Sequence, residues 1–476
     1  MVNAGAMANY DKRIVPFIIL LIANLALSAA DWPRFRGPNG SGVAADTGLP
    51  TEFGPTKNVA WKAAVPFGRS SPVVAGGRVF ITASEGDALV TLAYDAATGR
   101  PLWTRQVKRT HQHKTYKAND PASPTPAADA KSVYVFFPDF GLISYTFDGK
   151  ERWRHPLGPF ENFYGISSSP VIAEGLLLLL CDQTRGSFLA ALDKETGRQK
   201  WKTERATQTE GWSVPIVYKD QVLAVGSARV DSYFLSTGEP RWWMTLNSNG
   251  SMGTPVIHGD ALIVAASGSE QPWMPSFAAT VVKLDKDGDG RLSIPECKDE
   301  SEWFEHFAWV DSNHDQFLDE REWNVARSLG TGEYGAVAIP LAGEKKGQLD
   351  AASNVQWRFK RNLPYVPAPL LYDGVFYMAK DGGIVTSLEP GTGALLKQGR
   401  SEKAPGQYLA SPVAADGKIF MVSEEGKLTV LKAGAQWEVL AVNNLEDECY
   451  ATPAISGGRI FVRTRGTLYA FTAPAK

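Results

Sequence analysis

One unit recurs along nearly the whole chain, and it limits the fold more than any other feature. The unit begins with Ser/Thr-Pro and apolar residues, continues through a Gly/Asp turn and a β-branched run, and ends with Asp, a Thr-Gly turn and Trp. LAYDAATGRPLW and LAALDKETGRQKW are two copies of its end, closing at Trp103 and Trp201. Alternating apolar residues predict half-buried strands, and Gly suits the hairpin turns between them. Each unit is therefore expected to be a small antiparallel sheet.

Eight copies of this unit follow one another, and repeats of roughly 40–50 residues with four strands each predict a β-propeller. The last copy lacks its Trp strand, which NVAWKAAV (Asn58–Val65) supplies from the other end of the chain. That pairing closes the ring and removes two open sheet edges. We expect an all-β, eight-bladed propeller of four-stranded antiparallel blades. The copies begin at Ser70, Ser123, Ser169, Ser213, Gly253, Pro367, Ser411 and Thr452.

The quoted repeats resemble the Trp-docking repeats of quinoprotein-type (PQQ-like) eight-bladed β-propellers. That family includes alcohol dehydrogenases that use pyrroloquinoline quinone, and the non-enzymatic scaffold subunit of the outer-membrane β-barrel assembly machine. DWPRFRGPNGSG (Asp31–Gly42) is similar to the start of secreted PQQ-like repeat proteins of environmental bacteria. The resemblance covers residues 31–265 and 333–472, and it implies a fold more than an activity.

Blade five is interrupted. Its first two strands end near Ser267, whereas its Trp strand is NVQWRFK, Asn354–Lys360. GAVAIPLA (Gly335–Ala342) fits the missing third strand, with GEKKGQLDAAS as a long turn into the Trp strand. Residues 269–332 are then an insert with small helices. The expected divisions are a leader over 1–30, propeller over 31–268, the insert over 269–332, and propeller over 333–476.

The insert contains DKDGDGRLSIPE, which matches the spacing of an EF-hand calcium loop. Ca²⁺ prefers six to eight hard oxygens, which alternate positions of a winding loop supply, and Gly290 stands where the loop turns sharply. The alternative is an Asp-rich hairpin turn like the similar LDKETG (192–197). PSFAATVVKL, with helical spacing before the loop, favours calcium. The predicted ligands are Asp285, Asp287, Asp289, the Arg291 carbonyl, Ser293 and Glu296.

A second loop, DSNHDQFLDERE, repeats the scheme after the helix-like ECKDESEWFEHFAWV. Gln316 replaces the glycine of the sharp turn, so we expect weaker binding there. Leu292 and Leu318 hold the same position in the two loops and are expected to pair as a short β-bridge. The predicted ligands are Asp311, Asn313, Asp315, the Phe317 carbonyl, Asp319 and Glu322.

The topology places the insert. Links between the second and third strands of a blade emerge on the same face as links between blades, so the insert should stand over this entry face. Propellers of the resembling family bind ligands on that face. Residues just before the innermost strands are therefore candidate ligand contacts: Arg69, Tyr164, Trp212, Tyr365, Tyr408 and Tyr450. Ser or Thr follows most of them.

Aromatic faces and hydroxyls around a central depression suit a sugar, a quinone or a peptide segment. The alternative is that the Ser/Thr-Pro units only begin strands and that the aromatic residues cap the channel. In the link after blade one, His111 and His113 are spaced as a metal pair, but no third ligand is identifiable, which favours a polar loop.

Charge and the N-terminus narrow the setting. The formal net charge of −2 provides no basic field for nucleic acid. Lys12 and Arg13 precede the apolar run Ile14–Leu27 and the small residues SAA, the pattern of a signal peptide cleaved near Ala30. The apolar run is shorter than the ~20 residues that a spanning helix needs, although a retained anchor is the alternative. We expect a secreted or periplasmic monomer without a membrane span after cleavage.

Two functions remain open. Quinoprotein enzymes typically have an adjacent cysteine pair and catalytic carboxylates on the entry face. The three cysteines here, Cys181, Cys297 and Cys449, are far apart, and no carboxylate matches a catalytic motif of the family. We expect a scaffold that binds calcium and a small-molecule, carbohydrate or protein ligand. The alternative is a PQQ- or metal-dependent oxidoreductase, like alcohol or sugar dehydrogenases, with its site on the entry face.

Overall fold

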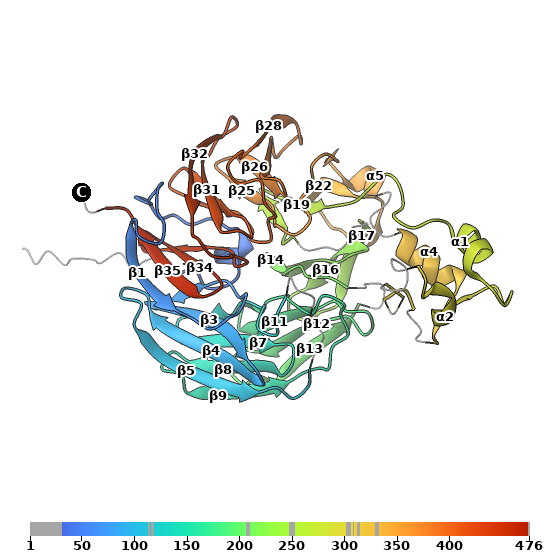
Figure 1. Ribbon diagram of the computed structural model, residues 1–476, viewed down its shortest axis with the longest axis horizontal. Helices are drawn as coiled ribbons and strands as arrows, with labels where there is room; N and C mark the ends of the chain where they lie inside the picture. Colours follow the sequence, from blue (N-terminus) through green and yellow to red (C-terminus); the bar gives the residue numbers. More distant parts are fainter. Residues whose placement is uncertain are drawn as a thin grey trace, which may run out of the picture.

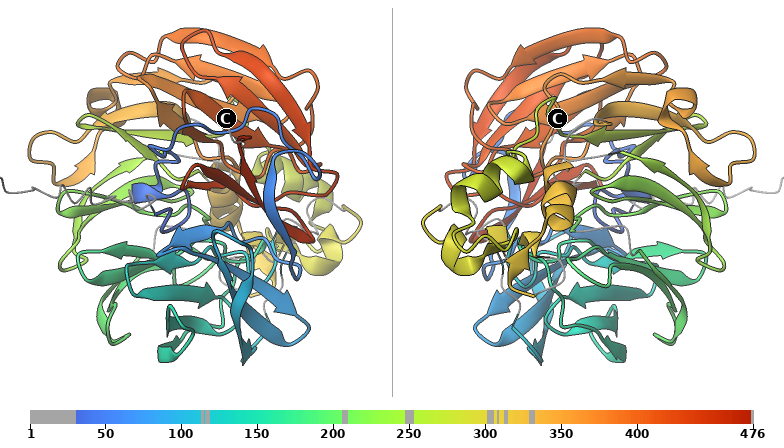
Figure 2. Two further views of the ribbon diagram at one scale, coloured as in Figure 1. Left: turned by 90° about the vertical axis from the view of Figure 1, so that its left-hand side faces the viewer. Right: turned by 90° about the vertical axis from the view of Figure 1, so that its right-hand side faces the viewer.

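The computed structural model describes residues 31–112, 115, 119–205, 210–246, 253–300, 306–307, 309–311, 315–328 and 333–474. Eight antiparallel sheets surround a central axis, and each contributes its first strand to the inside of the ring. Figure 1 shows the ring from its side, and Figure 2 shows it from its two faces. The chain is the eight-bladed propeller that the repeats predict.

The first four blades, from the innermost strand outward, have these bounds. Blade one contains β2 (Val73–Ala75), β3 (Arg78–Glu85), β4 (Ala88–Asp95) and β5 (Pro101–Lys108); blade two contains β6 (Ala127–Ala128), β7 (Ser132–Phe137), β8 (Gly141–Thr146) and β9 (Glu151–Pro156). Blade three contains β10 (Val171–Ala173), β11 (Leu176–Cys181), β12 (Phe188–Asp193) and β13 (Gln199–Glu204); blade four contains β14 (Ile216–Tyr218), β15 (Gln221–Val225), β16 (Arg229–Phe234) and β17 (Pro240–Thr245).

The remaining blades follow the same order. Blade five contains β18 (Val256–His258), β19 (Ala261–Ala266), β22 (Gly335–Pro340) and β24 (Trp357–Phe359); blade six contains β25 (Leu370–Tyr372), β26 (Val375–Lys380), β27 (Ile384–Leu388) and β28 (Leu395–Arg400). Blade seven contains β29 (Val413–Ala415), β30 (Lys418–Val422), β31 (Lys427–Lys432) and β32 (Glu438–Asn444); blade eight contains β33 (Ala454–Ser456), β34 (Arg459–Arg463), β35 (Thr467–Thr472) and, outermost, β1 (Val59–Ala64).

Tryptophan joins one blade to the next at five of the eight seams. Trp153, on the outer strand of blade two, donates its indole N–H to the Lys194 carbonyl in the Thr-Gly turn of blade three (2.9 Å). A Cβ on Gly197 in that turn would lie 2.5 Å from the indole, so only glycine lets the ring close over the turn. In the repeated Thr-Gly-x-x-x-Trp motif, the Thr-Gly turn therefore receives the tryptophan of the preceding blade, and the tryptophan docks on the turn of the next blade. Trp61, Trp103, Trp201 and Trp357 make the equivalent bond.

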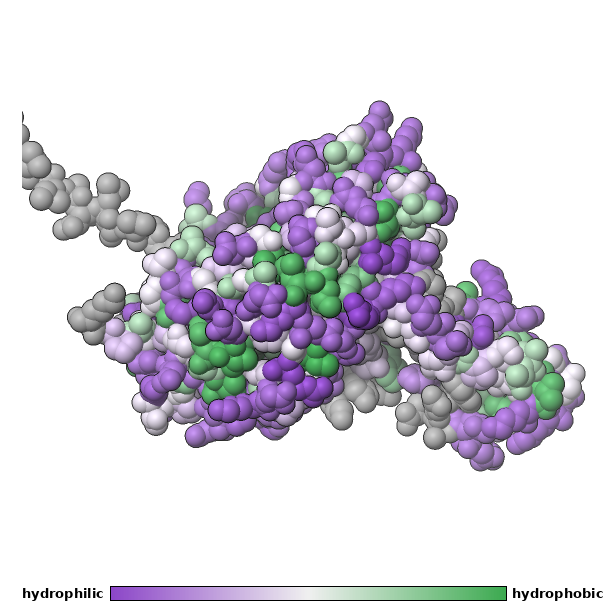
Figure 3. Space-filling model, turned by 90° about the horizontal axis from the view of Figure 1, so that it is seen from above, coloured by the Kyte–Doolittle hydropathy of each residue, from purple (hydrophilic) through white to green (hydrophobic). Residues whose placement is uncertain are grey.

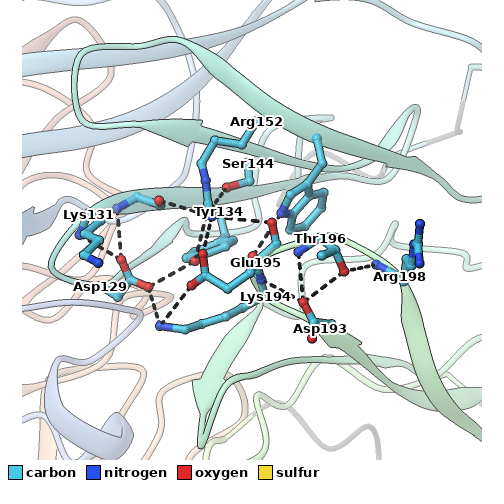
Figure 4. Close-up of polar contacts among 12 residues, drawn as sticks. Asp129, Lys131, Tyr134, Ser144, Arg152, Asp193, Lys194, Glu195, Thr196 and Arg198 are labelled. Carbon is cyan, nitrogen blue, oxygen red and sulfur yellow. Dashed lines mark hydrogen bonds and ion pairs between the residues drawn. The ribbon is translucent and has the colours of Figure 1, made fainter.

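Polar contacts reinforce the same seam (Figure 4). Lys194, in the turn of blade three, forms an ion pair with Asp129 of blade two (2.6 Å). Arg152 of blade two bonds to Glu195 in the same turn and to Ser132 in its own blade. Because these groups are partly shielded from water, they fix the relative position of the two blades as well as holding them together.

An N-terminal strap, residues 31–57, crosses the face opposite the blade entries (Figure 2, left). It includes the short 3₁₀-helix η1 (Pro38–Gly40). Asp31 accepts a hydrogen bond from Gly76 of blade one, Asn39 bonds to Val217 of blade four, and Asp46 accepts one from Gly458 of blade eight. The strap therefore ties blades together across the ring.

The insert leaves blade five between β19 and β22 and builds its own core. It contains α1 (Phe277–Leu284), β20 (Leu292–Ser293), α2 (Ile294–Cys297), β21 (Phe317–Leu318) and α4 (Glu320–Ser328). Its buried residues include Phe277, Leu284 and Trp323. It projects from the ring as a separate lobe (Figures 1 and 3) and stands over the face opposite the strap (Figure 2, right).

The stretch before Trp357 is more than a turn. Its residues form β23 (Gly347–Leu349) and the short helix α5 (Ala351–Asn354). β23 pairs in parallel with β17, so it extends blade four as a fifth strand. An outer strand is an open edge, and this segment covers it.

Candidate functional site

A pocket of about 580 Å³ occupies the entry face over the central channel. Its walls come from the links before the innermost strands and from the turns between second and third strands. Phe35 of the strap also lines it, so the strap reaches the channel from the opposite face. The lining includes five predicted contacts, Arg69, Tyr164, Trp212, Tyr365 and Tyr450.

One half of the pocket is charged and centres on Arg69. Its guanidinium lies over the ring of Tyr450, 3.9 Å from the ring centroid. The Tyr450 hydroxyl donates to Glu424 (2.9 Å) and lies 3.2 Å from Glu448, which also pairs with Arg465 (3.3 Å). Burial and the hydrogen bond to Glu424 raise the pKa of Tyr450, so the phenol stays protonated. This half thus presents donors and acceptors side by side.

Asp120 lies behind Arg69 and is deeply buried. Its carboxylate is 3.9 Å from Arg69 Nε, a distance that leaves both groups only loosely paired. Burial lowers the pKa of Arg69 and raises the pKa of Asp120. Among the described residues, Arg69 Nε and Nη1 and one Asp120 oxygen have no hydrogen-bond partner. Behind the pocket wall, Arg69 and Asp120 therefore keep hydrogen-bonding capacity that the described residues do not use.

The other half is aromatic. Tyr164 and Trp212 meet edge to face, with ring centroids 5.4 Å apart. The Trp212 indole donates to the Gly165 carbonyl (2.8 Å), and Asn119 donates to the Tyr164 carbonyl (2.9 Å). Tyr365 is 42% exposed, and burial of its hydroxyl beside Tyr164 raises its pKa to about 12. These bonds hold the rings in place before any ligand arrives.

Tyr408 lies outside this pocket. Its side chain is fully buried, and its hydroxyl donates to the Ala404 carbonyl (2.9 Å) inside its own link. Its neighbours Gln407 and Leu409 line the wall instead. Position before an innermost strand therefore selects the right link without fixing which side chain points inward.

The hydroxyls of the Ser/Thr-Pro units join blades. Each blade has one residue before proline at the start of its inner strand, and most of these residues carry a hydroxyl. The Thr452 hydroxyl accepts the Ser411 N–H (2.9 Å), and the Ser71 hydroxyl accepts the Thr452 N–H (3.0 Å). Thr125, Ser169 and Ser411 accept from the preceding blade in the same way.

Val214 and Ala368 occupy the position before proline in blades four and six, and neither residue has a hydroxyl. Arg34 and Arg36 of the strap reach these two places and donate to the carbonyls of the following prolines, Pro215 (3.1 Å) and Pro369 (2.6 Å). Both guanidinium groups are buried, which lowers the pKa of Arg34 to about 10 and that of Arg36 to about 9. The strap thus strengthens the side of the ring that lacks hydroxyls.

The first loop of the insert brings three of its predicted ligand side chains together. Carboxylate oxygens of Asp285, Asp287 and Asp289 lie within 4.8 Å of one another. Asp285 accepts the N–H groups of Gly288 (2.7 Å) and Gly290 (3.0 Å). Three clustered carboxylates with their oxygens turned to one point match the hard oxygen donors that Ca²⁺ prefers.

Glu296 closes the same loop. It accepts hydrogen bonds from the N–H groups of Ser293 and Lys286, each at 2.7 Å, and these bonds lower its pKa to about 2. The Arg291 and Ser293 backbone continues into β20, and Leu292 pairs with Leu318 as predicted. The last ligand position is therefore ionised and held toward the start of the loop.

The second loop is described in part. Asp311 accepts the Gln316 N–H (3.1 Å), Asp315 that of Phe317 (2.9 Å), and Glu322 that of Asp319 (3.2 Å). Gln316 has a φ of 69°, so this non-glycine residue adopts the left-handed backbone that the sharp turn demands. Asn313 lies outside the described residues.

The predicted histidine pair is described only in part. His111 contacts Thr110 and the Pro138 carbonyl, and its proposed partner His113 lies outside the described residues.

The predicted leader, residues 1–30, lies outside the described residues. Cys181, Cys297 and Cys449 are buried free thiols. In the part of the chain that the structure describes, no helix has the length and apolar character to cross a membrane.

The insert touches the propeller beside the pocket. Its His306 lies 5.9 Å, centroid to centroid, from Phe163, which precedes Tyr164 in the link between blades two and three. Glu210, from the next link, accepts the Phe163 N–H (2.6 Å) and the Thr184 hydroxyl (2.9 Å). Burial raises the pKa of Glu210 to about 7. The insert therefore stands on the pocket rim.

Three polar residues of the wall were not predicted: Glu424 and Arg465 from second-to-third-strand turns, and Glu448 from the link between blades seven and eight. Glu424 follows β30, Glu448 follows β32, and Arg465 follows β34. The same topological rule that placed the insert over the entry face could have found Glu424 and Arg465, because their turns emerge there as well. Phe35 was not foreseeable, since no repeat pattern predicts where the strap crosses the channel.

The ring, the Trp docking and the entry-face pocket define an eight-bladed propeller of the PQQ-like class. A family model described as outer membrane protein assembly factor BamB matches residues 43–185, 90–292 and 331–474. The chain belongs to this family. The unmatched residues between the last two segments fall within the insert.

Solved structures agree on the fold. BamB from Moraxella catarrhalis is 11% identical, with a TM-score of 0.55 over 87% of this chain and 99% of that one. A europium-containing methanol dehydrogenase is 11% identical, with a TM-score of 0.57 over 93% and 98%. The quinohemoprotein alcohol dehydrogenase from Comamonas testosteroni is 13% identical, with a TM-score of 0.55 over 94% and 81%. The comparison with curated proteins found no match.

Proposed function

We propose that this protein is an exported carbohydrate-binding propeller that also binds calcium through its insert. The observation that carries the proposal is the division of the pocket into an aromatic half and a half where charged donors and acceptors alternate. Tyr164, Trp212 and Tyr365 form the first half, and the Arg69–Tyr450–Glu424 group begins the second.

A sugar matches both halves. One face of a pyranose carries C–H groups that pack on an aromatic ring, and its hydroxyls both donate and accept hydrogen bonds. Glu424 and Glu448 accept, Arg69 and Arg465 donate, and Asn119 does both. A purely apolar ligand would leave the charged half buried and unpaired, which is costly. A polyhydroxylated ligand therefore suits the pocket best.

Calcium belongs to the insert in this proposal. Asp285, Asp287, Asp289 and Glu296 would supply side-chain oxygens, with Ser293 and the Arg291 carbonyl completing the first loop. In the second loop the proposed ligands are Asp311, Asn313, Asp315, Asp319, Glu322 and the Phe317 carbonyl. Bound calcium would neutralise these clustered carboxylates and stiffen the lobe beside the pocket.

A glycan array followed by calorimetry tests the pocket. The wild-type protein should bind one class of glycan, and Trp212→Ala should weaken that binding about tenfold or more through loss of the stacking surface. Tyr218→Ala is the control, because Tyr218 bonds to Asp260 on the opposite face. Failure of the wild-type protein to bind any glycan, or equal losses in both variants, would overturn the proposal.

Calcium calorimetry tests the insert separately. Asp285→Ala should abolish binding to the first loop, and Asp311→Ala binding to the second. No heat of binding in the wild-type protein would contradict the calcium proposal without affecting the pocket.

The rival function is a PQQ- or metal-dependent oxidoreductase. Its test is reduction of a redox dye by the purified protein with added pyrroloquinoline quinone, calcium and alcohols or sugars. Sustained dye reduction that Trp212→Ala abolishes would replace the binding proposal with an enzymatic one. Export and a monomeric state stay predictions, which N-terminal sequencing of the mature chain and light scattering check.

A further inference from the structure

We propose that Trp273 of the insert is a second carbohydrate subsite, continuous with the pocket, so that the protein takes an extended glycan chain. This inference rests on the proposed carbohydrate function and deepens it. Trp273 is 37% exposed, whereas the Trp residues that dock the blades are almost completely covered. An indole left open to water on a built surface is a stacking platform of the kind that sugars use.

Hydrogen bonds to α4 hold Trp273 in place. Its indole N–H donates to the Ala326 carbonyl (3.2 Å), and the Arg327 guanidinium donates to the carbonyl of the next residue, Met274 (3.1 Å). One residue further on, the Pro275 carbonyl accepts the indole N–H of Trp323 (2.9 Å). Because three successive residues are tied to one helix, the ring is fixed before a ligand binds, which lowers the entropic cost of stacking.

An unbroken series of aromatic contacts joins this platform to the pocket. Trp212 meets Tyr164 at 5.4 Å between ring centroids, Tyr164 meets Phe163 at 5.0 Å, Phe163 meets His306 at 5.9 Å, and His306 meets Trp273 at 5.6 Å. Trp309 adds a further ring beside Trp273, at 6.1 Å. The series crosses from blade to insert at the Phe163–His306 contact.

This arrangement favours a chain over a single sugar. Sugar units of a glycan repeat, so rings set out in sequence can each stack on one unit, whereas a compact ligand fills only the pocket. Phe35 lines the pocket from the side of the strap, and the rim lies on the entry face, so a chain longer than the pocket would extend over the rim. The insert stands on that rim, and Trp273 lies where the aromatic series leads.

Calorimetry with soluble neutral and uronic-acid oligosaccharides, each offered as a disaccharide and as a longer chain of the same repeat, tests the subsite. Trp273→Ala should weaken binding of the long chain about two- to tenfold and leave the disaccharide unchanged. Trp273→Phe should restore most of the loss. Tyr365→Ala, inside the pocket, should weaken both ligands. Val282→Ala is the control, because Val282 is 89% exposed on α1 of the same lobe.

The outcomes separate the two proposals. Wild-type protein that binds no glycan of either length overturns the carbohydrate function, and the subsite with it. Equal affinity for both lengths, or a Trp273→Ala loss that is the same for both, overturns the subsite alone. Self-association that Trp273→Ala abolishes, seen by analytical ultracentrifugation, would assign the platform to a second copy of the chain and likewise overturn the subsite. Thermal unfolding of each variant confirms that the lobe remains folded.

Discussion

At the scale of single residues, the Ser/Thr-Pro units carry two roles that the sequence does not separate. Ser71, Thr125 and Thr452 line the pocket wall. Each of these three also accepts a backbone N–H from the preceding blade. A buried N–H without a partner is costly, so the inter-blade role is enough to explain the residue type. A ligand role for these hydroxyls stays a prediction.

Paired threonine substitutions test this role. Thr452→Val removes the acceptor of the Ser411 N–H and should lower the free energy of unfolding by about 1–3 kcal/mol, because that N–H is left buried and unpaired. Thr254→Val is matched in type, burial and position, but among the described residues its hydroxyl has no hydrogen-bond partner. Thr254→Val should therefore lower the free energy of unfolding by well under half of that amount. Denaturant unfolding of both variants makes the comparison, and equal losses would contradict the inter-blade role.

Glu210 makes stability depend on pH. Its pKa of about 7 in the folded chain exceeds its ordinary value of 4.5, so the folded state binds more protons between these values than the unfolded state. Its contribution to stability is full below about pH 4.5 and is lost as the pH rises through about 7. Glu210→Gln should remove this slope, gaining stability relative to wild type as the pH rises from about 5 to about 8. Urea unfolding across that range measures it, with Glu161→Gln in the neighbouring link as control; parallel curves would contradict the assignment.

The same scale shows how far side-chain placement follows from sequence. Arg69, Tyr164, Trp212, Tyr365 and Tyr450 were predictable because their links precede innermost strands. Tyr408 shares that position but turns inward, since the Ala404 carbonyl in its own link takes its hydroxyl. Topology therefore selects the link, and local hydrogen bonding decides which side chain faces the pocket.

At the scale of elements, the two loops of the insert have similar backbone geometry at the sharp turn but differ in the residue that adopts it. Gly290 and Gln316 occupy the same position, with φ of 77° and 69°. Left-handed backbone costs a non-glycine residue roughly 1–2 kcal/mol. The β20–β21 bridge forces both loops into the same path, so the second loop bears this cost and the first does not.

Exchanging these residues tests the inequality. Gln316→Gly should relieve about 1 kcal/mol of strain and so strengthen calcium binding to the second loop about fivefold. Gly290→Ala should weaken the first loop by a similar factor. Isothermal titration of each variant with calcium measures both. A Gln316→Gly protein with unchanged calcium affinity would show that backbone strain is not what limits the second loop.

Some short elements could not be predicted from the sequence pattern. The repeat predicts the strands of every blade, because each unit repeats the same apolar runs between turn residues. The middle strands are buried along almost their whole length, as in β7 and β19. β23 escaped prediction, because Gly347–Leu349 is short and polar and gains its structure only by pairing with β17. Strand pairing between distant segments is decided by tertiary contact, which a local pattern does not record.

At the scale of the whole molecule, the ring is closed by its N-terminal end twice over. β1 pairs antiparallel with β35 from Val59↔Phe471 to Ala64↔Thr467, with one register shift between Val59 and Trp61, and it completes blade eight. The strap crosses the face opposite the blade entries and forms hydrogen bonds with blades one, four and eight. Both devices come from residues 31–64, so ring closure joins the two ends of the propeller.

Substitution of Trp61 tests whether the seam between blades eight and one contributes as much to the free energy of unfolding as the other seams. Trp61 of β1 docks on the Thr-Gly turn of blade one, donating to the Ala96 carbonyl (3.0 Å), with Gly99 under its ring as Gly197 lies under Trp153. Both indoles are nearly fully buried, so Trp61→Ala and Trp153→Ala should each cost about 3–5 kcal/mol of unfolding free energy.

Loss of the indole should have different consequences at the two seams. Trp153 lies within a continuous chain, so its blades stay tethered when the docking fails. β1 is held in blade eight by its pairing with β35 and not by a covalent connection to that blade, so Trp61→Ala should also make the N-terminal segment a preferred site of limited proteolysis, which Trp153→Ala should not. Guanidinium unfolding together with mass spectrometry of the fragments decides this. A Trp61→Ala protein as stable and as protease-resistant as wild type would show that the strap alone closes the ring.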